Sequence, residues 1–111
     1  MSQNPGVGQS FAGTISTKTP LTALTPAKAT VTGSSSSVVS SNSLRKGLII
    51  INLSMDVISL AFGSNNAVAN YGITLTEYGS TYQMSEYDFS TSAINAISSG
   101  TSSLISIQEF Q

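Results

Sequence analysis

The chain contains no cysteine and no histidine among its 111 residues. Without cysteine there is no disulfide framework, no thiolate zinc site and no thiol nucleophile. Without histidine, the commonest general base and the commonest metal ligand of proteins are also missing. We therefore expect a protein that is not an enzyme and that has no cofactor and no metal site.

Charged residues are scarce as well, at 8% of the chain, and the net charge is −1. A nucleic-acid-binding protein needs a basic surface, and four Lys and Arg residues do not provide one. About a quarter of the residues in a typical soluble protein are charged. Serine, threonine and asparagine take the place of charged residues here. This composition favours a surface that forms hydrogen bonds and is largely covered by partner proteins. The alternative is a neutral extracellular or virion surface without special partners.

Long apolar runs are absent, since the longest spans residues 48–51 and is too short to cross a bilayer. The beginning of the chain, MSQNPGVGQSF, lacks the cationic region and apolar stretch of a secretory signal. We therefore expect an intracellular origin and no association with a membrane.

Three prolines and several glycines interrupt residues 1–26, which show no strand or helix periodicity. Proline removes a backbone donor and keeps the preceding residue extended. The segment is therefore interpreted as an extended N-terminal arm that lies on its own body or on a neighbouring subunit. Its large apolar residues are the expected contacts of this arm with the surface on which it lies: Val7, Phe11, Ile15, Leu21 and Leu24.

Residues 27–111 are different, because short β-prone segments alternate with turns rich in Gly, Ser and Asn. Seven or eight strands at spacings of about 8–12 residues are typical of an all-β sandwich or barrel. The predicted fold is a small antiparallel, jelly-roll-like β-sandwich with an N-terminal arm. Strands are expected in the following segments: 27–32, 37–42, 47–54, 56–62, two within 71–84, 93–97 and 104–107.

Strand pairing can be predicted from the short links. Residues 47–53 are almost continuously apolar and are expected to form the central strand, with 56–62 as its hairpin partner. Residues 93–97 and 104–107 are expected to form a closing hairpin that turns at Gly100. A helix over 88–97 is the alternative for that region. Four side chains of 71–84 are expected to face inward: Ile73, Leu75, Tyr82 and Met84.

Few side chains have the spacing of a reactive or ligand-binding site. Glu86 and Asp88 would lie on one side of an extended segment and could chelate Ca²⁺, but further oxygen ligands and a tight glycine turn are missing, so a solvated acidic loop is the favoured interpretation. Asn52-Leu53-Ser54 has the form of a glycosylation sequon, which we interpret as a chance match.

The four tyrosines fall within one short window, and they could form an interface or a sugar-binding patch. Ordinary half-buried packing in a sandwich is the alternative. These residues are Tyr71, Tyr78, Tyr82 and Tyr87.

Arg45 and Lys46 are half of all the basic residues, and they directly precede the most apolar strand. One interpretation is that they lie at the rim of the sandwich, where they keep a β-prone segment soluble. The other is that they form ion pairs with carboxylates of a partner.

Three segments resemble small β-proteins encoded by tailed bacteriophages: LRKGLIIINLSMDVISLAFG, YGITLTEYGSTYQM and AINAISSGTSSLISIQEF. With the long arm, the chain is similar to capsid decoration (cement) proteins. The resemblance implies a homotrimer on the outer surface of a phage head, assembled in the host cytoplasm and bound to the major capsid protein. The apolar residues of the N-terminal arm would then be its contacts with the capsid. Related members are fibre- or tail-associated modules, so a β-sandwich that recognises host glycans is the alternative function.

Overall fold

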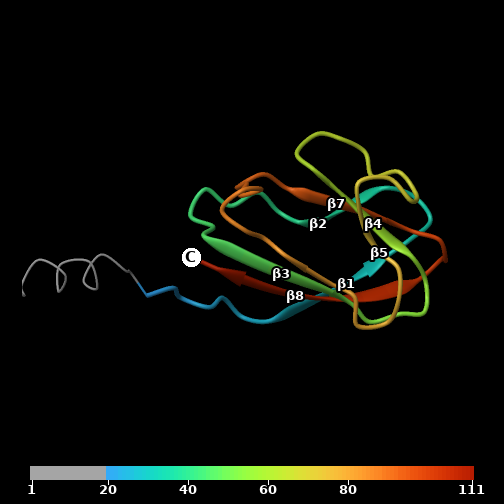
Figure 1. Ribbon diagram of the computed structural model, residues 1–111, viewed down its shortest axis with the longest axis horizontal. Coiled ribbons are helices and arrows are strands. Elements are labelled where there is room, and N and C mark those ends of the chain that lie inside the picture. Colours follow the sequence, from blue (N-terminus) through green and yellow to red (C-terminus); the bar gives the residue numbers. More distant parts are fainter. Residues whose placement is uncertain (1–19) are drawn as a thin grey trace, which may run out of the picture.

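The computed structural model describes residues 20–111. Their regular structure consists of eight β-strands, shown in Figure 1. The strands are β1 (Ala27–Val31), β2 (Ser36–Val39), β3 (Gly47–Asn52), β4 (Ile58–Phe62), β5 (Ile73–Leu75), β6 (Thr81–Gln83), β7 (Ile94–Ser98) and β8 (Ser103–Phe110). The predicted all-β class is confirmed, and the alternative of a helix over 88–97 is wrong because part of it forms β7. None of the described residues belongs to a helix that could span a membrane.

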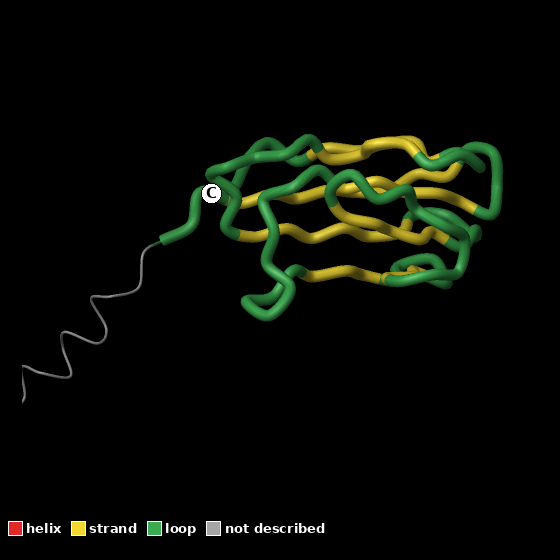
Figure 2. The backbone as a smooth tube through the Cα atoms, turned by 90° about the horizontal axis from the view of Figure 1, so that it is seen from above, coloured by secondary structure: helices red, strands yellow, loops and turns green. Residues whose placement is uncertain are grey.

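The strands form two antiparallel sheets, ordered β1-β8-β3-β6 and β2-β7-β4-β5. β1 pairs with β8, β2 with β7, β3 with β6 and β4 with β5. This nested pairing is the connectivity of a jelly roll. Each link between consecutive strands crosses from one sheet to the other, except the link between β4 and β5, which are neighbours in the same sheet. The seen-from-above view of Figure 2 shows the strands running along the length of the body. The predicted jelly-roll-like sandwich is therefore confirmed.

Two predicted hairpins are wrong. β3 pairs with β8 and β6, and β4 lies in the other sheet beside β7 and β5. β7 and β8 are likewise in different sheets. The links from β3 to β4 and from β7 to β8 are arches that cross from one sheet to the other. A short, turn-rich link has the same sequence pattern whether it forms an arch or a hairpin. The prediction that β3 lies inside its sheet is confirmed.

The core lies between the sheets and consists of the alternate residues of each strand. β3 contributes Leu48 and Ile50, and β8 contributes Ile105 and Ile107. The predicted inward side chains Leu75, Tyr82 and Met84 are buried, and Ile73 packs against the same core. The outward residues of β3 are half-buried, so this strand is less enclosed than its apolar sequence predicts.

Antiparallel order places the loops at two ends of the body. We call the first the turn end, formed by residues 32–35, 53–57, 76–80 and 99–102. The second is the terminal end, formed by loops 40–46 and 84–93 with residues 20–24 and the C-terminus; Figure 1 marks the C-terminus there.

Loop 63–72 begins near β7 and folds back, because the Ala67 N–H donates to Ser35 Oγ at 2.8 Å. The turn end is packed tightly, since a Cβ added at Gly100 would collide with the Asp56 carboxylate.

Candidate functional site

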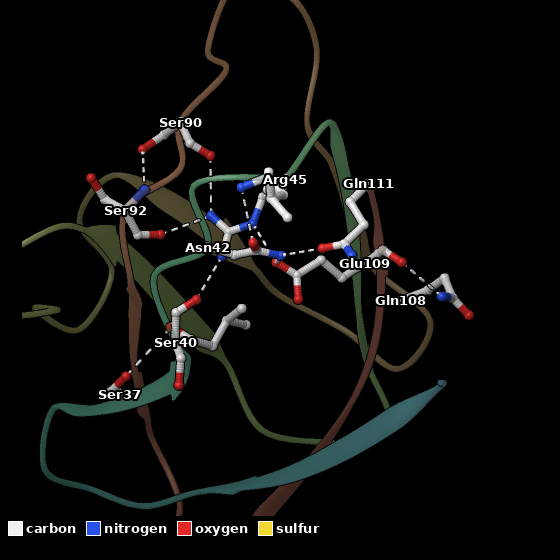
Figure 3. A network of polar contacts seen from close by, with 11 residues as sticks. Ser37, Ser40, Asn42, Arg45, Ser90, Ser92, Gln108, Glu109 and Gln111 are labelled. Carbon is white, nitrogen blue, oxygen red and sulfur yellow. Dashed lines mark hydrogen bonds and ion pairs between the residues drawn. The ribbon is translucent and has the colours of Figure 1, made fainter. Parts of the chain in front are cut away.

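The terminal end is organised around Arg45, whose side chain is only 1% exposed. Its Nε donates to Glu109 Oε2 at 2.7 Å, an ion pair between loop 40–46 and the end of β8. Its Nη1 donates to the carbonyl oxygens of Ser90 and Ser92, and its Nη2 donates to that of Ser40. Figure 3 shows this guanidinium enclosed by the loop segments. A planar group with several donors can satisfy all these oxygens at once.

Asn42 completes the network. Its Nδ2 donates to Glu109 Oε2 and to Gln111 Oε1, both at 3.1 Å, as Figure 3 also shows. Its backbone N–H donates to Thr91 O, and its Oδ1 accepts the N–H of Leu44. Loops 40–46 and 84–93 and the C-terminus are thus held in one arrangement by buried polar contacts.

Both interpretations of Arg45 as a surface residue are wrong, because this side chain is buried and satisfied within the chain. Lys46, the next residue, is exposed at the terminal end. Its backbone N–H donates to Phe110 O at 2.8 Å. Of the predicted basic pair, only Lys46 remains available to a partner.

The tyrosines do not form one patch. Tyr82 is 7% exposed and belongs to the core, where its ring packs edge-on against Phe62. Tyr78 is exposed at the turn end, whereas Tyr87 is 91% exposed at the terminal end. Tyr71 is exposed in the loop between β4 and β5. The predicted grouping of all four side chains is therefore wrong, and Tyr82 is excluded as an interface residue.

Asp88 has a structural role in loop 84–93. Tyr82 Oη donates to Asp88 Oδ2 at 2.6 Å, while the N–H and hydroxyl of Ser85 donate to Oδ1. These hydrogen bonds, the one from Tyr82 first, lower the pKa of Asp88 below its ordinary value of 3.8. Burial, followed by the hydrogen bond to Asp88, raises the pKa of Tyr82 well above 10.

This arrangement favours the acidic-loop interpretation of Glu86 and Asp88 over the calcium loop. Within residues 20–111, no three His, Cys, Asp or Glu side chains gather in the manner of a metal site.

The sequon residue Asn52 is fully buried at the turn end. Its Nδ2 donates to the carbonyl oxygens of Asp56 and Leu75, and its Oδ1 accepts from the N–H and hydroxyl of Ser54. The folded chain therefore offers no access to this amide, which agrees with a chance match.

The predicted arm is only partly described. Val7, Phe11 and Ile15 lie outside the described residues. Residues 20–26 extend the edge of the first sheet: the Leu24 N–H donates to Glu109 O at 2.9 Å, and Thr22 and Gln111 exchange two backbone hydrogen bonds. This part of the arm lies on its own body. Leu24 is half-buried, and Leu21 remains exposed.

Two hollows meet at Lys46. The first, of about 240 Å³, has a largely apolar wall that includes Leu21, Ile49, Met84 and Phe110. The second, of about 250 Å³, is lined by Thr22, Leu44, Lys46 and Gln111. Both are open hollows of the surface, and both include residues that the Arg45 network or the β8 pairing holds in place.

Exposed apolar side chains also lie in the segments that form the terminal end. Leu44, Tyr87 and Phe89 are exposed in the two loops that Arg45 joins, and Leu21 is exposed beside the C-terminus. Leu44 and Phe89 were not predicted, because a single apolar residue in a polar loop carries no periodic signal. A rigid surface with exposed apolar side chains, a polar rim and one cation is suited to binding a protein partner.

Comparison of the chain with models of protein families, with curated proteins and with solved structures finds no match.

Proposed function

We propose that the protein is a structural subunit of a phage virion, a decoration subunit that binds the major capsid protein through its terminal end. The observation that carries the proposal is the set of exposed apolar side chains at the terminal end, where a buried arginine joins two loops to the end of β8: Leu21, Leu44, Tyr87 and Phe89. A preorganised surface loses little conformational entropy on binding. The role is structural and not enzymatic.

Two further observations support the proposal. The resemblance of residues 44–110 to phage β-proteins concerns the strands and links of the body. The jelly-roll connectivity is also common among viral capsid domains, although it occurs in lectins too, so it supports the proposal by analogy. As in the proteins it resembles, the subunit is proposed to act as a homotrimer, in which several weak contacts bind with avidity.

The experiment is co-sedimentation of the full chain with undecorated phage heads. The paired change Leu44→Ser and Tyr87→Ser removes apolar area from the terminal end, and Met55→Ser with Tyr78→Ser is the matched change at the turn end. Buried interface anchors contribute about 2 kcal/mol each, so the first variant should bind at least tenfold more weakly. The turn-end variant should bind normally. An equal loss of binding in both variants, or no loss in either, would refute docking through the terminal end.

Native mass in solution tests the trimer separately. Sedimentation equilibrium should give three times the chain mass of 11.5 kDa. A monomer that also fails to sediment with heads would contradict the whole proposal.

The alternative function is a fibre- or tail-associated module that binds host glycans. Tyr87 and Phe89 favour it, because two exposed aromatic rings alternate with Glu86 and Asp88 in one loop, and rings and carboxylates can both contact sugars. Binding to a glycan array that Tyr87→Ala abolishes and Tyr78→Ala does not would support this function over capsid docking.

A further inference from the structure

The outer face of the first sheet has an apolar centre. Along β3 the core residues alternate with Ile49 and Ile51, which point away from the core. Leu53 follows two residues later, and its N–H donates to Leu104 O at 2.9 Å. Leu104 of β8 is itself 37% exposed. A solvated face of an antiparallel sheet normally carries polar side chains, so this group of large apolar residues indicates a face that a partner covers.

Uncharged polar side chains flank this apolar centre. The residues opposite Ile49 and Ile51 on the two neighbouring strands are Gln108, Ser106, Gln83 and Thr81. In the four strands of the first sheet, Lys28 is the only charged residue that points outward, and it lies on the edge strand β1. An apolar centre with few charges and a polar rim is the composition of a protein interface.

The outer face of the second sheet, in contrast, is covered by the chain itself. Ser59 points outward from β4 but is only 1% exposed, and a backbone N–H of loop 63–72 donates to its Oγ at 2.9 Å. Asn95 of β7 donates to two carbonyl oxygens of the same loop. On the first sheet, Gln108 donates to Leu24 O at the edge. Within the described residues, no loop is hydrogen-bonded across the centre of that sheet.

We propose that the outer face of the first sheet is the surface through which three copies of this chain meet. The face is thus covered by a second copy, and the inference rests on the homotrimer of the proposed function. Because the face has no carboxylate and its one ammonium group belongs to the edge strand, copies can approach each other without strong like-charge repulsion.

The direction of the strands supports this choice of surface. The strands run along the length of the body, and the terminal end lies at one end of it (Figure 2). Three copies that meet side by side, around an axis parallel to the strands, direct their terminal ends the same way. All three can then contact one capsid surface, as the proposed avidity requires. Contact through the terminal end itself would cover the surface proposed for the capsid.

Sedimentation equilibrium of surface variants tests the inference. Ile51→Glu and Ser106→Glu each place a carboxylate at the centre of the face in every copy. Half of the trimer should then be dissociated at a protein concentration about tenfold higher than for wild type, or more. Ser37→Glu, a matched change at an exposed position of the second sheet, should leave the mass at three times 11.5 kDa. Circular dichroism checks the fold of each variant.

The outcomes separate this inference from the proposed function. Ser106 is already polar, so its variant decides the matter if Ile51→Glu does not fold. A wild-type mass in the folded variants would overturn the inference and leave the trimer standing. A monomeric wild type would overturn the inference together with the trimer. Docking on the capsid is tested separately by the terminal-end variants on phage heads.

Methyl NMR of the wild-type chain locates the contact. Dilution to concentrations at which the trimer dissociates should shift the signals of Ile49 and Ile51. The signals of Ile97, which points outward from the second sheet opposite Ser59, should remain unchanged. Dissociation that shifts Ile97 and leaves Ile49 and Ile51 in place would overturn the inference.

Discussion

Arg45 remains inside the fold because each of its three side-chain nitrogens donates to an oxygen. The carboxylate of Glu109 comes from β8, and the three carbonyl groups come from two loops. An unpaired buried charge would cost several kcal/mol, so the network and the burial depend on each other. In the sequence, the Arg-Lys dipeptide has the features of a solvated rim, because three of the four partners of Arg45 are distant along the chain: Ser90, Ser92 and Glu109.

Replacing Arg45 by Ala should destabilise the protein by about 3–5 kcal/mol, because Glu109 and the loop carbonyl groups would lose their donor. Arg45→Lys should recover only part of this loss, since an ammonium cannot reproduce the planar set of donors. Urea unfolding followed by circular dichroism measures both. The control Lys46→Ala alters an exposed neighbour and should stay within about 0.5 kcal/mol of wild type. A similar loss in the control would contradict a specific role for Arg45.

Asp88 should make stability depend on pH on the acid side. Its pKa is lowered in the folded state, so ionised Asp88 stabilises the fold above its ordinary pKa of 3.8. This contribution is lost as the pH falls through the lower, folded-state value. Urea midpoints between about pH 5 and pH 2 should fall less steeply in Asp88→Asn and Tyr82→Phe. Glu86→Gln, a change of the same kind in the same loop, should keep the wild-type slope. An unchanged slope in Asp88→Asn would contradict the assignment.

At the scale of elements, the strands were predictable and their partners were not. Apolar alternation and turn residues located β3, β4 and β7 to within two residues, because these signals are local, whereas β8 continues to Phe110, three residues beyond the predicted 104–107. Pairing depends on which sheet a strand enters after its link. The link 99–102 was interpreted as a hairpin turn, yet hydrogen bonds join it to the loop after β3: the Ser99 N–H donates to Val57 O, and the Val57 N–H donates to Ser99 Oγ, both at 2.9 Å. No local pattern identifies such an arch.

Pairing of the last part of the arm with the body was not predicted either. Proline at positions 20 and 26 favours extended backbone, which suits a free arm and the edge of a sheet equally. Residues 21–24 pair with the end of β8, and a lone edge segment with few apolar residues has no periodicity that would reveal this pairing.

Truncation separates the two parts of the arm. A chain beginning at Pro20 keeps the backbone hydrogen bonds of Thr22 and Leu24 and should retain wild-type stability to within about 1 kcal/mol. A chain beginning at Ala27 loses three of these bonds, worth about 0.5–1.5 kcal/mol each, and should unfold at a lower urea concentration. Hydrogen exchange at the Gln111 amide should rise only in the shorter chain. Equal stability of both chains would contradict a structural role for residues 20–26.

At the scale of the whole molecule, the jelly roll pairs the first strand with the last. Ala27 of β1 is opposite Ile107 of β8, so the outermost pair closes only when nearly the whole described chain is in place. The terminal end depends on the same pairing of β1 with β8, because Glu109 and Gln111 reach loop 40–46 from the end of β8. The terminal end could not be predicted from the sequence, because its residues come from four separate segments of the chain.

Refolding should therefore be slow for a chain of this size. Folds dominated by long-range strand pairing refold in milliseconds to seconds, whereas folds with local contacts need microseconds. Stopped-flow dilution from urea can follow the buried Tyr82 by fluorescence, since the chain has no tryptophan. The control Lys46→Ala should refold at the wild-type rate. Complete recovery within the microsecond range would contradict late closure of β1 on β8.

The backbone hydrogen bonds between Thr22 and Gln111 have a practical consequence for protein engineering. A cargo domain fused to the C-terminus would emerge among the side chains proposed to bind the capsid and would obstruct them. Joining Gln111 to Pro20 by a short linker and opening the chain at Gly33–Ser34 would give a circular permutant with both new ends at the turn end. Such a permutant would carry its cargo on the opposite side of the body and leave the terminal end free.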